Sequence, residues 1–338
     1  GLDCSIRQAG IDFANSGYRL WHANKAGRDN LRNGIAPPDS GHPKFNKHAD
    51  DIDYQIEADF SGLIAPGLPN AVIEMGEKFG RLMNYGDGVY GGQFVGGMYA
   101  EAFFEDDPLK LVEAGLACVP ADSMFAECIR DTIGWWKANP DDWQKTWELI
   151  EAKYQDDPNH RKFSCSGPTA EFNIDAKINA AYIVMGMLFG KRKLEDTIAI
   201  SMRCGQDSDC NPSNASGVIA TTIGKSKLAP KYVSELQPNK VFSHTAYSFP
   251  ALVEVCEKLA RQAVVKHGGR IEKTDEGDVF VIPVSKVKPG KLEQCWEPGP
   301  VAGSKFTAAE MEQIETQGGP KNLQAALEKV APGWKLVN

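Results

Sequence analysis

Two aspartates one residue apart lie in the stretch RCGQDSDCNPSN, residues 203–214. Asp207 and Asp209 could point to the same side of an extended turn, where two carboxylates repel each other unless a divalent cation or a proton joins them. Gly205 permits a sharp turn, and the Asn-Pro pair that follows is typical of a helix start. The spacing indicates half of a metal-binding catalytic site. The structural alternative is that one aspartate only caps the next helix.

Two other interpretations of this stretch fail on spacing. A calcium loop of the EF-hand type needs a central glycine and a glutamate twelve residues into the loop, whereas Asp209 is followed by a cysteine and a proline. Cys204 and Cys210 could form a redox pair only if the turn folded back on itself, and the eight cysteines include no C-x-x-C pair. Such sparse cysteines are expected to pack as small apolar residues.

A second group of carboxylates could supply acid or base chemistry. Asp53 and Glu57 are four residues apart, so they share one face of a predicted helix, and a buried carboxylate pair is costly without a metal or an arginine. We take these two as catalytic candidates, with Asp59 as a third. The alternative is that Asp50, Asp51 and Asp53 form a solvated first helical turn.

Three histidines lie near these carboxylates in the sequence. His42 and His48 bracket the loop GHPKFNKH and could reach a ligand, and His48 is the candidate for a substrate contact. His22 follows Trp21 in a helical pattern, which favours packing.

Composition restricts the functional class. The chain has 338 residues and a net charge of -8, with no cluster of Lys and Arg, which argues against nucleic-acid binding. No apolar run reaches the roughly 18 to 20 residues that a membrane span needs. The chain opens on GLDCSIRQAGIDFA, which resembles the interior of a domain, so we expect it to begin partway through a longer polypeptide. Cellular compartment and oligomeric state are left open.

The elements that must position these groups are mostly helices. Apolar periodicity predicts helices over most of residues 5–235, interrupted by a long loop over 33–51. After residue 235 the pattern predicts one more helix, then strands in RIEKTD and EGDVFVIPV around an Asp-Glu-Gly turn, and short helices in TAAEMEQIETQ and NLQAALEKV. The predicted fold is mainly α, an orthogonal helical bundle over 1–235 with a small C-terminal α/β appendage over 236–338.

The run TIAISMRCGQDSDCNPSNASGVIATTIG, residues 197–224, resembles the C-terminal motif of the ADP-ribosylglycohydrolase family. That motif is an apolar helix, then Gly-x-Asp-x-Asp-Thr/Ser, then a small-residue helix ending in Gly. IEADFSGLIAPG resembles a degraded form of the family's Gly-Asn-Gly and Met-Arg-x-x-Pro segment, and Pro66 is the residue that matches most clearly. NYGDGVYGGQFVGGMYA falls where the family has a histidine-bearing turn. The resemblance covers roughly residues 5–230.

The resemblance implies an all-α fold whose cleft holds two Mg²⁺ or Mn²⁺ ions. Such enzymes cleave the N- or O-glycosidic bond between ADP-ribose and a protein side chain. It makes Asp207 and Asp209 metal ligands and puts Cys210 at the position of a third ligand, where the family has a hydroxyl. A neutral thiol is a poor partner for a hard cation.

Two further departures from the family pattern bear on the site. The first metal motif of the family, Thr-Asp-Asp, does not occur, and Asp50-Asp51 lacks the threonine and stands in the wrong order, so we expect that motif upstream of Gly1. The histidine-bearing turn is replaced by Asn84, Tyr85, Gly86 and Asp87. These four residues, together with His48 and Gln206, are expected to contact a different substrate.

The resulting hypothesis is a divalent-metal-dependent hydrolase of a glycosidic bond. Its substrate would be an ADP-ribosyl or related ribosyl conjugate, either a small molecule or linked to a protein. Two alternatives stay open. Cys210 and the missing first motif favour a non-catalytic binding protein on the same fold, and the altered turn at 84–88 favours a glycoside hydrolase acting on another sugar.

Overall fold

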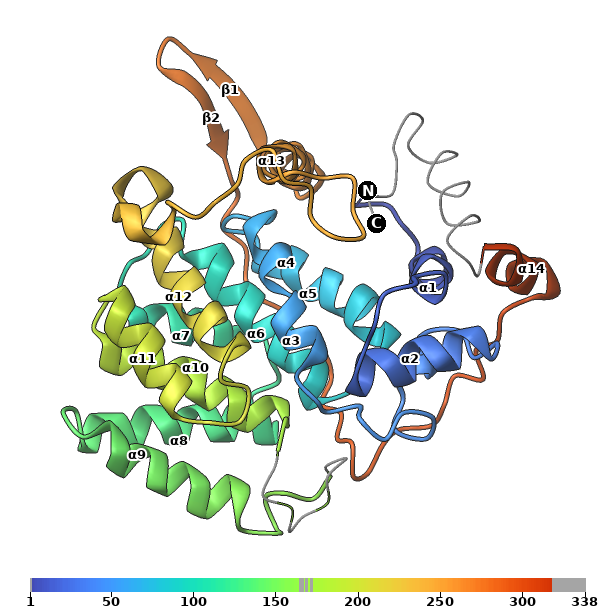
Figure 1. Cartoon of the computed structure of the whole chain (residues 1–338), viewed down its shortest axis with the longest axis horizontal. Coiled ribbons are helices and arrows are strands. Elements are labelled where there is room, and N and C mark those ends of the chain that lie inside the picture. Colours follow the sequence, from blue (N-terminus) through green and yellow to red (C-terminus); the bar gives the residue numbers. More distant parts are fainter. Residues whose placement is uncertain (1, 164–166, 168–169, 171–172, 318–338) are drawn as a thin grey trace.

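The computed structural model of the chain describes residues 2–163, 167, 170 and 173–317, and it is mainly α-helical, as the sequence predicts. Figure 1 shows the helices packed in layers at varied angles around a central pair, α6 and α10. The helices before the hairpin are α1 (Ile6–Ala14), α2 (His22–Arg32), α3 (Asp53–Glu57), α4 (Asp59–Leu63), α5 (Pro69–Phe79), α6 (Asp87–Glu101), α7 (Pro108–Ala117), α8 (Met124–Ala138), α9 (Trp143–Ile150), α10 (Ala176–Gly190), α11 (Leu194–Arg203), α12 (Cys210–Ile223) and α13 (Phe249–Lys266).

The core is built on α10, whose residues are all buried, and on α6, which is buried from Asp87 to Ala100. The largest apolar cluster joins these two helices to α7, α8 and α12, with Phe94, Phe125 and Ile183 among its members. A helix that is buried on all sides requires apolar or small residues at nearly every position, and the sequences of α6 and α10 meet this requirement.

Small residues let the neighbours of α6 approach closely. A Cβ atom added at Gly92 would overlap the ring of Tyr54 on α3, and one added at Gly96 would overlap Ser61 on α4. The predicted 52–66 helix is observed as two short helices, α3 and α4, which meet at Ala58. These contacts fix the distance between α6 and the acidic helix α3.

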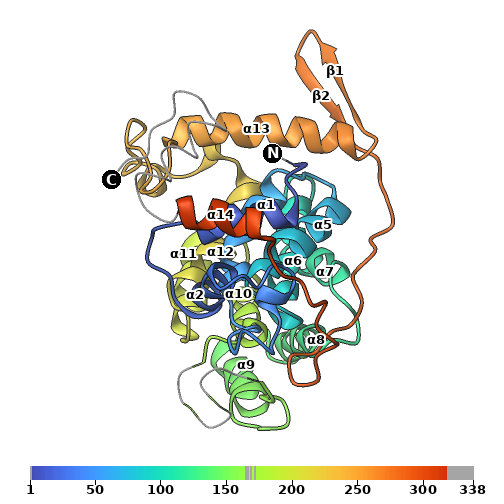
Figure 2. The same cartoon turned by 90° about the vertical axis from the view of Figure 1, so that its right-hand side faces the viewer.

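The C-terminal elements also follow the predicted pattern. β1 (Arg270–Thr274) and β2 (Gly277–Val281) form an antiparallel hairpin with Arg270 opposite Val281, and it projects from the helical body. Figure 2 shows α13 lying across one end of the bundle, where it packs against α4 and α5. The predicted helix α14 (Ala308–Gln317) packs on α1, and the predicted helix in NLQAALEKV lies outside the described residues.

Between the hairpin and α14 the chain runs back along the bundle. Asp39 accepts hydrogen bonds from the amides of Ala302 and Ser304, at 2.9 and 2.7 Å. The hydroxyl of Tyr85 accepts one from Gly299 N at 3.0 Å. This extended segment therefore covers the 84–86 turn and the 33–51 loop.

We predict that Gly92→Ala destabilises the fold by about 1–3 kcal/mol, because the new methyl group collides with Tyr54 in a packed core. Gly134→Ala is the matched control on α8, where nothing lies within 4 Å of the added Cβ, and it should stabilise by up to about 1 kcal/mol. Urea unfolding measures both. Equal effects of the two substitutions would contradict the packing described here.

Candidate metal centre

The turn between α11 and α12 presents Asp207 and Asp209. Gly205 and Gln206 both have positive φ, 95° and 54°, which makes the turn tight. Asp209 is the N-cap of α12, with its carboxylate accepting from Cys210 N at 3.0 Å. The Oδ2 atom of Asp207 is buried and has no hydrogen-bond partner among the described residues. Capping therefore accounts for Asp209 but leaves Asp207 with an unsatisfied oxygen suited to a cation.

The two aspartates and Cys210 interact electrostatically. Burial raises the pKa of Asp207 to about 6, and a hydrogen bond with Asp209 adds to the rise. The same hydrogen bond lowers the pKa of Asp209. Burial and both carboxylates raise the pKa of Cys210, so its sulfur stays a thiol at neutral pH. Ligand atoms of the three residues lie within 4.8 Å of one another.

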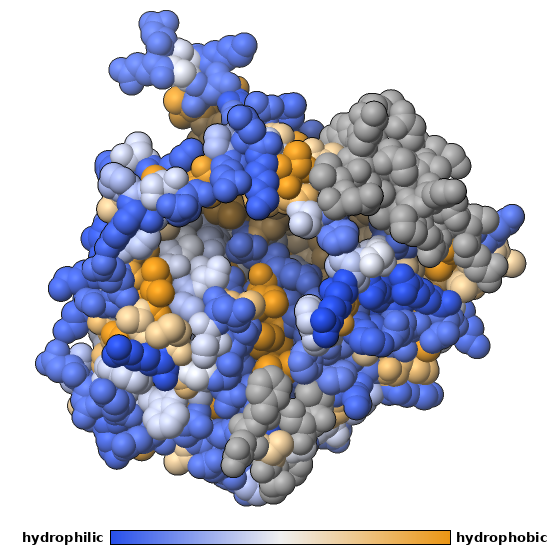
Figure 3. Space-filling view, viewed as in Figure 1, coloured by the Kyte–Doolittle hydropathy of each residue, from blue (hydrophilic) through white to orange (hydrophobic). Residues whose placement is uncertain are grey.

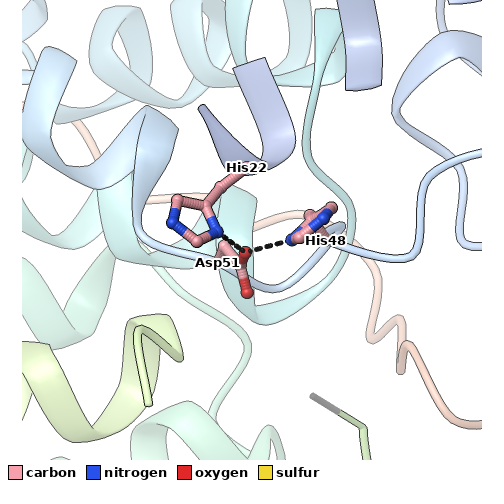
Figure 4. A group of neighbouring side chains, drawn as sticks. All are labelled: His22, His48 and Asp51. Atoms are coloured by element: carbon pink, nitrogen blue, oxygen red, sulfur yellow. Dashed lines mark hydrogen bonds and ion pairs between the residues drawn. The ribbon is translucent and has the colours of Figure 1, made fainter. Parts of the chain in front are cut away.

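A second cluster joins His22, His48 and Asp51. The Oδ2 atom of Asp51 lies 2.8 Å from His48 Nδ1 and 3.5 Å from His22 Nδ1. Figure 4 shows both imidazole rings directing Nδ1 at this one oxygen. The hydrogen bond to Asp51 raises the pKa of His22, and Asp207 contributes to the same rise. The carboxylate of Asp51 is 2% exposed, whereas both histidines keep part of their surface accessible.

Buried amides hold this second cluster in place. Asn46 donates to Ala23 O and Met83 O, at 3.1 and 2.7 Å, and accepts from His48 N at 2.9 Å. Asn84 donates to Asp51 O at 2.8 Å and to Ala49 O at 3.0 Å. These amides therefore set the backbone on which His48 and Asp51 stand.

Asp53 and Glu57 lie on α3 directly after this cluster. The carboxylate of Asp53 accepts from the amides of Ala23 and Asn24, so it caps the N-terminus of α2 beside His22. Burial raises the pKa of Asp53 to about 6, against the hydrogen bond from Asn24. The Glu57 carboxylate accepts from Asn24 Nδ2, and crowding by protein atoms raises its pKa to about 7, although the side chain opens to a pocket.

The pocket beside Glu57 is lined mainly by aromatic and apolar side chains. Its volume is about 280 Å³, and its walls include Tyr18, Tyr54, Phe60 and Phe79. Figure 3 shows a hollow with exposed apolar surface near the centre of this face, between α12 and α2. A flat, apolar part of a bound molecule would fit this pocket, which lies beside Glu57, one helical turn after Asp53.

Residues 173–179 connect the two clusters. Ile52 N donates to Ile174 O at 3.0 Å and Ala176 N donates to Asp50 O at 2.9 Å, so the backbone beside Asp51 is paired with the start of α10. On the other side, Asn179 Oδ1 accepts from Asp207 N at 3.2 Å. Both clusters therefore contact the same short segment, and the charge of Asp207 acts on His22.

A buried charge cluster lies at the base of this segment. Lys177 forms an ion pair with Asp175, and both are almost fully buried. Burial opposes the charge on Lys177, but the attraction of Asp175, Asp87 and Asp50 raises its pKa above the usual range. Burial raises the pKa of Asp87 to about 7 and, with repulsion from Asp175, raises that of Asp50 well above its ordinary value.

The expected substrate contacts in the 84–87 turn occupy buried positions. Asn84 is fully buried and its amide binds main-chain groups. Tyr85 and Gly86 lie against the C-terminal segment at Gly299 and Glu293, and Asp87 belongs to the buried charge cluster. Likewise, the Oε1 atom of Gln206 accepts from Asn173 N at 2.8 Å. These residues hydrogen-bond to or pack against the protein itself, and their contact with a substrate stays a prediction.

Sequence reasoning missed His22 and Asp51. The helical pattern favours packing for His22, but this residue starts α2 with φ of 45°, a conformation that costs a residue with a Cβ atom about 1–3 kcal/mol. Asp51 differs from the family's Thr-Asp-Asp motif in its order along the chain, so the sequence does not predict it as a ligand. The available signal was the spacing of His48 and Asp51, three residues apart, which can place both side chains at one point.

Fold and site together define a mainly α-helical protein whose carboxylate and imidazole groups are candidate ligands for a divalent cation. The family model of ADP-ribosylglycohydrolase matches residues 4–268, and the chain belongs to this family. Membership indicates a glycohydrolase acting on ADP-ribosyl-type substrates, in a family that generally binds divalent metals. No curated protein and no solved structure matches the chain. None of the described helices is both long and apolar enough to cross a membrane.

We predict that Lys177→Met destabilises the protein by about 3–5 kcal/mol, because it leaves three buried carboxyl groups without their cation. The loss should be larger at pH 8 than at pH 5. Without the ammonium group the pKa values of Asp50 and Asp87 in the folded protein rise further, so protonation stabilises the fold at low pH, and this contribution is lost as pH rises through those values.

Urea unfolding at both pH values measures this effect. Lys153→Met is the matched control, since Lys153 pairs with Glu127 and Asp131 near the surface, and it should cost below about 1 kcal/mol. A Lys177→Met variant as stable as the control at pH 8 would show that the buried cluster is not a structural determinant.

Proposed function

We propose that the protein is a divalent-metal-dependent hydrolase of a glycosidic bond in an ADP-ribosyl or related ribosyl conjugate. The observation that carries the proposal is that Asp207 and the backbone of the His22–His48–Asp51 cluster both contact residues 173–179. The unsatisfied Oδ2 of Asp207 fits a cation such as Mg²⁺ or Mn²⁺, and two ions would give each cluster one.

Asp207 and Asp209 would hold a cation on the α12 side, and Asp51 with its histidines would hold one on the α2 side. A bound divalent ion polarises substrate oxygens and lowers the pKa of its water. Cys210, kept as a thiol, would contribute little to a hard ion and more to the shape of the site. His48 then serves as a ligand, in place of the substrate contact expected from the sequence.

Glu57 is the stronger proton carrier of the two catalytic candidates. Its side chain is accessible from the pocket and its pKa is raised, so the carboxyl group can give a proton to the leaving-group atom as the glycosidic bond breaks. Asp53 has both oxygens engaged by the amides of α2, so we assign it to positioning His22. The aromatic pocket beside Glu57 would receive the leaving group.

The experiment measures release of the ribosyl product from N- and O-linked ADP-ribosylated peptides and from free ribosyl conjugates. We predict that hydrolysis requires Mg²⁺ or Mn²⁺ and stops on chelation. The double variant Asp207→Asn with Asp209→Asn should be at least about 100-fold slower, because it removes the carboxylate ligands of one ion.

Asp141→Asn is the control, since Asp141 lies on the surface in an ion pair with Lys191 and its loss should leave the rate unchanged. Thermal melting verifies that each variant is folded. Undiminished hydrolysis by the double variant would refute the assignment of these ligands. Metal-independent binding of ADP-ribose without hydrolysis of any substrate would instead favour the binding-protein alternative, which the thiol at position 210 motivates.

A further inference from the structure

We propose that the β1–β2 hairpin is a self-association surface, at which β1 pairs antiparallel with β1 of a second copy of this chain. The two strands form a two-stranded sheet, so each has one edge with no strand beside it among the described residues. An unpaired edge is a template for another strand, and a hairpin of two strands alone is at best marginally stable. Self-association is separate from the proposed function, because it is measured without substrate or metal.

The hairpin stands clear of the helical body on the side of β1. Figures 1 and 2 both show it projecting beyond α13. Arg261 of α13 holds it through β2, because the guanidinium donates to Asp278 Oδ2 at 2.6 Å and its Cζ lies 5.1 Å from the centre of the Phe280 ring. On β1 every side chain is exposed except that of Ile271, which is half-buried. β2 is therefore tied to the bundle, and β1 is the open edge.

The alternation of main-chain groups decides which residues of β1 could bond to another strand. Thr274 and Gly277 flank a two-residue turn and lie opposite each other, so they form a hydrogen-bonded pair of the hairpin. Main-chain groups alternate in direction along an antiparallel strand. The N–H and C=O groups of Ile271 and Lys273 therefore point away from β2, toward the open edge.

Charge selects one register for two copies of β1. With Ile271 opposite Ile271 of the second copy, Arg270 of each chain lies opposite Glu272 of the other. Moving the centre of the pairing by one residue places Arg270 opposite Arg270, or Glu272 opposite Glu272. Centring it on Lys273 places two lysines opposite each other. Opposite charges stabilise a cross-strand pair and like charges destabilise it, so of these four registers only the one centred on Ile271 is free of repulsion.

Charged residues on an edge strand often prevent pairing. β1 differs from such a strand, because its charges have both signs in a self-complementary order. Within one chain the Arg270 guanidinium already lies 2.6 Å from Glu272 Oε1, and both side chains are exposed. Pairing would join two such ion pairs about a two-fold axis without burying a lone charge. The resulting dimer is a four-stranded sheet in which the two β1 strands are central.

Sedimentation velocity of the whole chain over a series of concentrations tests the proposal. We expect a reversible dimer of the wild type with a Kd roughly in the micromolar range, because two short strands make a small interface. Ile271→Pro should abolish the dimer, since it removes an outward N–H group but no hydrogen bond of the hairpin itself. Ile271→Val is the matched control, which keeps this N–H group and should leave the dimer unchanged. Circular dichroism verifies that each variant is folded.

Exchange of the charges gives a test that loss of folding cannot imitate. Arg270→Glu and Glu272→Arg each place like charges opposite each other, so each should weaken self-association by about tenfold or more. An equimolar mixture of the two variants should form a heterodimer, and the double variant should form a homodimer again, because opposite charges then lie opposite each other. Lys145→Glu is the control for net charge, since Lys145 lies exposed on α9 and its substitution should leave the dimer unchanged.

A wild type that stays monomeric throughout the series would overturn the proposal. A dimer that persists in folded Ile271→Pro would do the same, as would charge variants whose mixture and double variant fail to recover the association lost in the single variants. Hydrolysis takes no part in these measurements. Failure of the proposed function would therefore leave the dimer intact, and absence of the dimer would leave metal-dependent hydrolysis open to its own test.

Discussion

The buried ion pair of Lys177 with Asp175 is the interaction on which the rest of the site depends. Burying two charges is costly unless they are paired and further hydrogen-bonded. Asp175 meets that condition, because it also caps α10 by accepting from Lys177 N at 3.0 Å. The start of α10 therefore has little freedom to shift. Residues 173–179, at the start of α10 and just before it, form hydrogen bonds with Ile52, Asp50 and Asp207. This segment therefore fixes the positions of both clusters.

The second constraint is the close packing of α6. Glycines on this helix let Tyr54 and Ser61 approach its backbone, which places α3 and α4 directly over the core. At the start of α6, Asp87 reaches the same buried charges as Lys177. One cluster of charges and one stripe of small residues thus set the positions of α3, α6 and α10. The candidate ligands lie at or just before the starts of α2, α3 and α12, which pack around this core.

The sequence was most informative where the chemistry is local. The Asp207–Asp209 turn, most of the helices and the hairpin follow from short stretches of residues and are seen in the structure. The family also follows from such a stretch, and the family model confirms it. The cluster of His22, His48 and Asp51 could not be found in this way, because the 15–21 and 33–51 segments fold back to bring it together. The NYGDG turn resembles an exposed loop in the sequence. It is buried because the segment near Gly299, some two hundred residues further on, packs over it.

We propose that the two clusters form one cation centre around residues 173–179. Anomalous X-ray diffraction from crystals soaked in Mn²⁺ tests it most directly, because the signal marks the ion itself. We expect one peak within bonding distance of Asp207 and a second bounded by His22, His48 and Asp51. Manganese found only at surface carboxylates, with neither position occupied, would contradict it.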